Sequence, residues 1–173
     1  MLQNQMRTAM GTRRIGSGPG HHEQLFWSIR AIQSLLDEIH GTWAIRIGVT
    51  NPQLTMIFAL RDFDSQGNGL PVKEVARILS VDPTFVTTQS KVLEAKGFVS
   101  RTSSNEDARV VRLSLSDKAL KQLANLSARQ KKLTDYIFAE LTEQGIQALV
   151  SKVLALNIRM EKASAIASID LDD

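Results

Sequence analysis

The stretch from Asp82 to Leu115 constrains the fold most, because its apolar residues change period partway along. They first recur at the spacing of a helix, and after Gly97 they alternate with a period of two, as in a strand. Asp82 is a typical N-cap residue followed by a proline, and Gly97 suits the left-handed position that ends a helix. The pattern therefore predicts a helix of about four turns from Pro83 to Lys96, followed directly by two strands.

The predicted helix has two different faces. Val86, Ser90 and Leu93 share one face at helical spacing. The outer face is short, polar and weakly basic, and it carries Thr84, Thr87, Thr88 and Lys91. Hydroxyl and ammonium groups hydrogen-bond phosphates and base edges, and a threonine methyl group suits the methyl group of thymine. Taken alone, such a face more often belongs to an ordinary solvated helix, so its meaning depends on the neighbouring elements.

The two predicted strands enclose a polar tip, residues 103–109, which is too polar to bury and too long for a two-residue turn. The alternating sets are Phe98, Ser100 and Thr102 on the first strand and Val111, Leu113 and Leu115 on the second. A further helix is predicted upstream, starting near Pro71, with an apolar face of Val72, Val75, Ala76 and Leu79. Residues 80–82 then form the tight turn of a helix-turn-helix, and the whole layout is that of a winged helix.

These motifs resemble the MarR family, the multiple-antibiotic-resistance type of transcriptional regulator. The string LEAKGFVSR is similar to the family's junction between helix and wing, and Asp107-Ala-Arg109 followed by VVRLSLS resembles its wing signature. The similarity extends more weakly over residues 23–162. Two features depart from the family pattern: Gln89 and Ser90 replace residues that are commonly apolar, and residues 170–173 have no counterpart.

The resemblance implies that the helix from Pro83 to Lys96 enters the major groove of DNA. It also implies that Arg109 reaches into a flanking minor groove, whose negative potential suits an arginine on a protruding tip, and that Asp107 braces it through a charge-assisted pair. The residues expected to contact DNA are Thr84, Thr87, Thr88, Lys91, Arg101, Asp107, Arg109 and Arg112.

A purely structural role is the alternative for several of these residues. The Asp107 and Arg109 pair could be a surface ion pair that only stabilises the hairpin, worth at most about 1 kcal/mol. Arg101 and Arg112 could hold phosphates or simply cover the strands. Phe85 is expected to pack beneath its helix and not against a duplex.

Long apolar stripes flank the winged helix. Residues 23–49 are predicted to form an amphipathic helix with a kink or break at Gly41. Asn51 is predicted to cap the next helix, with Pro52 at its first position, as Asp82 and Pro83 do. Ser116 is predicted to be the N-cap of a helix whose apolar stripe continues to Leu141, and Thr142 begins another helix. Such helices find too little partner surface inside so small a domain, so we expect them to form a homodimer interface.

Aromatic and cationic residues near the start of the chain suit a small-molecule pocket. The candidates are Phe26, Trp27, Arg30, Trp43 and Arg46. Aromatic walls with one or two cations fit an aromatic carboxylate or a larger acyl thioester. The more ordinary role of these tryptophans is to anchor a core or a dimer interface. The resemblance implies release of DNA by small phenolic or acyl effectors.

Composition excludes several other classes. With no cysteine, the chain has no disulfide, no thiol nucleophile and no cysteine-ligated metal, and it does not fit the cysteine-based peroxide sensors of the family. No metal-ligand spacing surrounds the three histidines, and no nucleophile elbow or phosphate-binding glycine loop is present, so we expect no metal, no cofactor and no enzymatic activity. The net charge of +3 is compatible with nucleic acid. No apolar run approaches the ~20 residues of a membrane span, which favours a cytoplasmic protein.

The predicted fold class is mainly α with a small β-wing, a winged helix-turn-helix with dimerisation helices at both ends. The predicted segments are a flexible basic tail (1–20), an N-terminal dimerisation helix region (21–50), the DNA-binding domain (51–116), C-terminal dimerisation helices (117–165) and an acidic tail (166–173). The expected function is an effector-responsive homodimeric regulator, more a repressor than an activator, on a palindromic operator in double-stranded DNA. The alternative is a winged helix that binds another protein without reading DNA.

Overall fold

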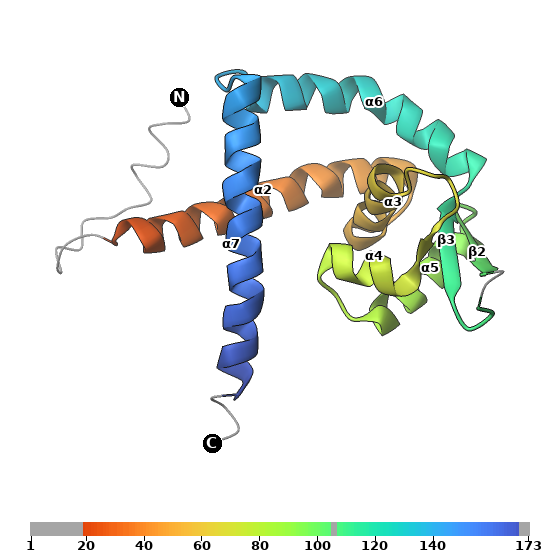
Figure 1. Cartoon of the computed structure of the whole chain (residues 1–173). Helices are drawn as coiled ribbons and strands as arrows, with labels where there is room; N and C mark the ends of the chain where they lie inside the picture. Colours follow the sequence, from red (N-terminus) through yellow and green to blue (C-terminus); the bar gives the residue numbers. More distant parts are fainter. Residues whose placement is uncertain (1–18, 105–106, 170–173) are drawn as a thin grey trace. The chain divides into compact units, whose positions relative to one another are not determined.

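The computed structural model describes residues 19–104 and 107–169 (Figure 1). The chain divides into two compact units, Met1–Leu120 and Lys121–Asp173. Most of the predicted basic tail and the last four residues of the predicted acidic tail lie outside the described residues. Among the described residues, no helix is long and apolar enough to cross a membrane.

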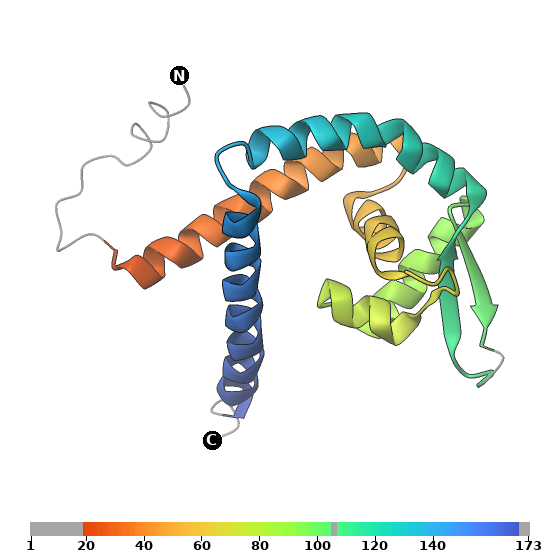
Figure 2. The same cartoon turned by 45° about the horizontal axis from the view of Figure 1, so that its top comes forward.

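The first unit carries the predicted winged helix. Its elements are α2 (His21–Ile47), α3 (Asn51–Phe63), β1 (Leu70–Pro71), α4 (Val72–Leu79), α5 (Pro83–Ala95), β2 (Val99–Ser103) and β3 (Val111–Leu115). Helix α6 (Asp117–Ile137) begins in this unit, and α7 (Glu143–Ile169) belongs to the second. Figure 2 shows α3, α4 and α5 gathered beside the strands of the wing. The mainly α fold with a small wing is therefore confirmed.

The described strands form an antiparallel sheet with the order β1-β3-β2. Leu70 pairs with Leu113, and Val99 pairs with Leu115. Beneath the sheet lies an apolar core in which the largest fully buried side chains include Leu54, Met56, Ile57, Leu60, Val75, Val86, Leu93 and Leu113. The two-residue strand β1 was not expected, because so short a segment has no period of its own.

Both ends of α5 form as the sequence predicts. Asp82 is the N-cap, and its carboxylate accepts a hydrogen bond from the backbone N–H of Thr84 at 2.7 Å. At the other end Gly97 has a φ of 75°, and the N–H groups of Gly97 and Phe98 donate to the carbonyls of Glu94 and Leu93. This is a Schellman motif, which stops the helix and sends the chain directly into β2. Phe98 lies in the turn before the strand and is buried there, whereas Ser100 and Thr102 lie on β2 and are exposed.

The N-cap of α5 gives a prediction about stability in acid. Hydrogen bonds from Thr84 hold the pKa of the Asp82 carboxyl below its ordinary value. A lowered pKa means that this carboxylate stabilises the fold above its unfolded-state pKa, and the contribution is lost as the pH falls through the folded value. An asparagine at this position would still cap the helix but cannot titrate. We therefore expect the Tm of Asp82→Asn to fall less than that of the wild type between about pH 5 and about pH 3 in thermal melts. If the Tm of both proteins fell by the same amount, the acid dependence would belong to other carboxyl groups.

Two expectations about the first helices are wrong. Helix α2 runs without a break through Gly41, because an interior glycine that keeps a helical conformation costs only about 1 kcal/mol. The helix ends instead at Gly48, which has a φ of 78°. Helix α3 is capped by Thr50 and not by Asn51. The side chain of Asn51 donates to Asp37 of α2, at 3.1 Å to the carboxylate.

The second unit consists of the remainder of α6 and the whole of α7. Thr142, predicted as the first residue of the next helix, precedes α7 and caps it, because its hydroxyl accepts from the N–H of Gly145 at 3.1 Å. Ser116 likewise caps α6 through the N–H of Ala119. Helix α6 ends at Ile137, before the predicted end of its stripe at Leu141. Large apolar side chains along α7 are about half exposed, namely Leu149, Val150, Val153, Leu154 and Ile158.

Candidate nucleic-acid interface

Helix α5 presents a polar outer face and buries the opposite one. Val86, Ser90 and Leu93 are fully buried, as their spacing predicts. On the other side Thr84, Thr88 and Lys91 are exposed, whereas Thr87 is partly buried. Phe85, expected to pack beneath the helix, is instead 38% exposed on its first turn.

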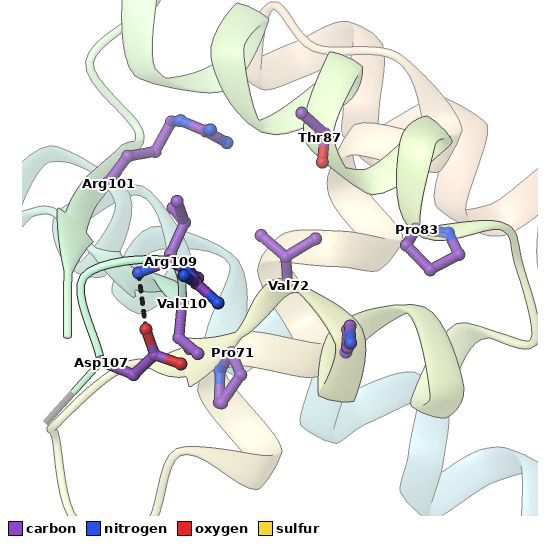
Figure 3. Close-up of a pocket in the computed structure, with 10 residues that line it drawn as sticks. Pro71, Val72, Pro83, Thr87, Arg101, Asp107, Arg109 and Val110 are labelled. Atoms are coloured by element: carbon purple, nitrogen blue, oxygen red, sulfur yellow. Dashed lines mark hydrogen bonds between the residues drawn. The ribbon is translucent and has the colours of Figure 1, made fainter.

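A cavity of about 610 Å³ lies beside this face, between α5, the start of α4 and the wing (Figure 3). Three cationic side chains line it, from Lys73, Arg101 and Arg109, together with the carboxylate of Asp107. In Figure 3, Thr87 and Arg101 lie on one side of this space, and Val72, Arg109 and Val110 border it from the other. The excess of positive charge favours an anion such as a phosphate group.

The wing tip is shaped by Asp107. Its carboxylate accepts a hydrogen bond from the backbone N–H of Arg109 at 2.9 Å, the dashed line in Figure 3. The N–H of Val110 donates to the backbone carbonyl of Asp107 at 2.9 Å. The expected brace through the Arg109 guanidinium is therefore corrected, since this carboxylate bonds to the backbone. An aspartate side chain commonly bonds the N–H two residues onward, and here it fixes the turn and not the arginine's rotamer.

The two arginines on the strands are engaged with the protein itself. The Arg101 guanidinium donates to the hydroxyl of Ser90 and lies 3.6 Å from the carboxylate of Glu94, and its side chain is only 12% exposed. The Arg112 guanidinium donates to the carbonyls of Asn68 at 2.9 Å and Gly69 at 2.6 Å. This geometry favours the structural alternative for both arginines, and their contact with phosphates stays a prediction.

A buried polar network explains why a polar residue is tolerated at position 89, where the family pattern is apolar. Gln89 accepts a hydrogen bond at 3.0 Å from the amide of Gln53, which is buried in α3. The Gln53 oxygen accepts in turn from the N–H of Thr50 and from Lys96, whose ammonium also reaches the carbonyl of Gly48 at 2.9 Å. The network joins the end of α2, the start of α3 and α5. Gln89 is only partly buried, and its side-chain oxygen is paired inside the fold with the buried Gln53, which fits the rule that buried polar groups are hydrogen-bonded.

The candidate effector residues all lie on α2, and the structure does not bring them together. Trp27 and Trp43 are sixteen positions apart, which is about 24 Å along a helix. Phe26, Trp27 and Arg30 form an exposed group near the N-terminal end, and Trp43 and Arg46 lie near the other end. The effector role of these residues stays a prediction.

Trp43 contributes to packing between α2 and α3. Its ring lies 5.8 Å from that of His40 and 6.3 Å from that of Phe58, which is buried in α3. Burial lowers the pKa of His40, and the nearby charge of Asp37 acts in the opposite direction. In the part of the chain that the structure describes, no group of three or more His, Asp or Glu side chains is placed to hold a metal ion.

Known proteins share this sequence pattern. Residues 49–111 match the sequence model of the MarR family. The chain is 33% identical over 97 residues to the HTH-type transcriptional repressor MdtR of Bacillus subtilis, a match that covers 56% of this chain and 60% of that protein. It is 26% identical over 113 residues to the HTH-type transcriptional regulator PapX of Escherichia coli, 65% of each protein. The chain thus spans less than two thirds of the length of either relative.

Solved structures share the fold. A MarR protein from Peptoclostridium difficile has a TM-score of 0.70 at 15% identity, covering 88% of this chain and 95% of that chain. MepR of S. aureus, solved as a DNA complex, has a TM-score of 0.68 at 15% identity, covering 82% and 99%. At such identities the likeness is evidence for the fold alone.

The capped helix, tight turn and wing define the chain as a winged helix-turn-helix protein. The segment that matches the family runs from the turn after α2 to the first residue of β3, so it covers most of this domain. This domain is therefore similar to the MarR family.

Proposed function

We propose that this protein is a transcription regulator that binds double-stranded DNA through α5 and the wing. One observation carries the proposal: an N-capped helix with a hydroxyl-rich exposed face adjoins a cavity lined by three cations, one of them on the wing tip. Threonine and lysine on a helix in the major groove bond phosphates and base edges. Arg109 on the tip suits a narrow minor groove. The match to the MarR family model and the DNA complex of MepR support the same assignment.

The regulator is proposed to act as a homodimer. The apolar faces of α2 and α7 are about half exposed in the described chain, and they are far larger than the scattered apolar residues usual on a monomer surface. A second copy of the chain would cover both faces. Two copies of α5 related by a twofold axis would then meet successive major grooves about 34 Å apart, so we propose a pseudo-palindromic operator.

We further propose repression relieved by a small effector. MdtR is named a transcriptional repressor, which supports repression over activation. The exposed group of Phe26, Trp27 and Arg30 supports an aromatic carboxylate or acyl thioester as the effector, because it offers aromatic surface beside a cation. Such a ligand releases DNA only if it binds one arrangement of the dimer better than the other, by a few kcal/mol.

Selection from a random duplex library tests the proposed function. The full chain is expected to enrich a single motif with two inverted half-sites, and the enriched duplex should bind more tightly than a scrambled duplex of the same composition in a mobility-shift titration. Failure to enrich any motif would contradict sequence-specific binding. It would favour the winged helix as a module that binds another protein.

A further inference from the structure

The outer face of α5 has an apolar edge that polar contacts with DNA do not explain. Phe85 is 38% exposed and Val92 is 39% exposed. The two residues are seven positions apart, so they lie on the same side of the helix. Val81, in the turn just before the helix, is also exposed. Buried positions of α5 are already filled by Val86 and Leu93, so these exposed residues are not part of the core of the unit.

This apolar edge lies beside the polar strip of Thr84, Thr88 and Lys91, because these positions follow one another around the helix. Thr87, on the opposite edge of the strip, lines the cationic cavity with Lys73 and Arg109. The outer face of α5 is therefore cationic on one side, hydroxyl-rich in the middle and apolar on the other. The cations mark one side that suits phosphates. Phe85 lies in the first turn of α5, and the N-terminal residues of a recognition helix are those that contact base edges.

We propose that Phe85, supported by Val92, determines specificity by contacting the methyl groups of thymines in the major groove. This inference rests on the proposed function and identifies the chemical group on the bases that one part of the interface recognises. The thymine C5-methyl group is the apolar group that base edges display in the major groove, and phenylalanine is among the side chains that contact it. A cytosine or adenine at the same position would leave the exposed ring against a polar edge. The operator is therefore expected to carry thymine opposite Phe85 in each half-site.

Replacing thymine with deoxyuridine tests the contact, because this change removes the methyl group and leaves base pairing and phosphate charge unchanged. The probe is the duplex enriched by the wild-type chain, with one thymine of each half-site replaced at a time. Burying one methyl group corresponds to about a fourfold change in affinity. We expect the wild type to lose about this factor at one or two positions in each half-site. Phe85→Ala should bind the thymine and deoxyuridine duplexes equally.

Two further variants make the test specific. Phe63→Ala removes another exposed phenylalanine, 58% exposed at the end of α3, and should keep the full sensitivity to the methyl group. Phe85→Leu keeps an apolar side chain at this position and should keep part of the sensitivity to the methyl group. The proposal is overturned if the wild type binds both duplexes equally, or if Phe85→Ala remains as sensitive as the wild type. Absence of any selective duplex binding by the wild type would overturn the proposed function as well, so the two failures are distinguishable.

Discussion

Val153→Glu in α7 is expected to convert the protein from a dimer into a monomer and to lower its affinity for the enriched duplex by about a hundredfold or more. Val153 is 48% exposed in the second unit, among other half-exposed apolar side chains of the same helix. In a dimer this face would be covered, and an unpaired carboxylate buried there is strongly unfavourable. Loss of the proposed dimer would separate the two copies of α5, and each single copy would then bind DNA weakly. Light scattering gives the mass, and a fluorescence-anisotropy titration gives the affinity.

Ala155→Glu is the matched control for this prediction. Ala155 lies two positions after Val153, on the other side of α7, beside Lys152 and Arg159. The control adds the same charge to the same helix and should leave both mass and affinity unchanged. A Val153→Glu protein that remains dimeric would remove α7 from the interface. A monomer that keeps wild-type affinity would show that one copy of the winged helix is sufficient.

Arg109→Ala is expected to weaken binding to the enriched duplex by about 5-fold to 30-fold, which corresponds to about 1–2 kcal/mol for a charge-assisted contact. The Tm should change little, because the wing turn depends on the backbone N–H of residue 109, which alanine also supplies. Binding titrations and thermal melts on the same preparations measure the two quantities.

Arg159→Ala serves as the control for net charge. Arg159 is an exposed arginine of α7, far along the sequence from the wing, and its removal takes away the same formal charge. The control should bind DNA nearly as well as the wild type. If Arg109→Ala binds the duplex as tightly as the wild type, the wing tip takes no part in binding. If both variants lose the same affinity, Arg109 contributes only through the net charge of the protein.

The sequence predicts those parts of the fold that local chemistry decides. Asp82, Pro83 and Gly97 each act on the backbone within a few residues of their own position, so the ends of α5 follow from the residues present. The same holds for Ser116 and Thr142, whose hydroxyls cap the helices that they precede. The prediction for Gly41 failed because a glycine permits a break without requiring one.

The sequence does not reveal contacts between residues that are distant along the chain. Gln89 departs from the family pattern, and its partner Gln53 lies thirty-six positions away in another helix. Arg101 looks like a free cation on a strand until the fold places it against Ser90 and Glu94. The exposure of Phe85 is of the same kind, because helical spacing alone does not say which face the rest of the domain covers. The set of residues that contact DNA therefore stays a prediction, and how each side chain is held within the fold required the structure.

The salt dependence of binding to the enriched duplex tests the central claim most directly. A dimer that neutralises about six phosphates releases their counterions, so the logarithm of the association constant should fall linearly with the logarithm of the salt concentration, with a slope of about −5. Arg109→Ala should reduce the magnitude of this slope by about one for each phosphate that its guanidinium neutralises. A slope near zero would contradict the account, because it would mean that α5 and the wing do not meet the phosphate backbone.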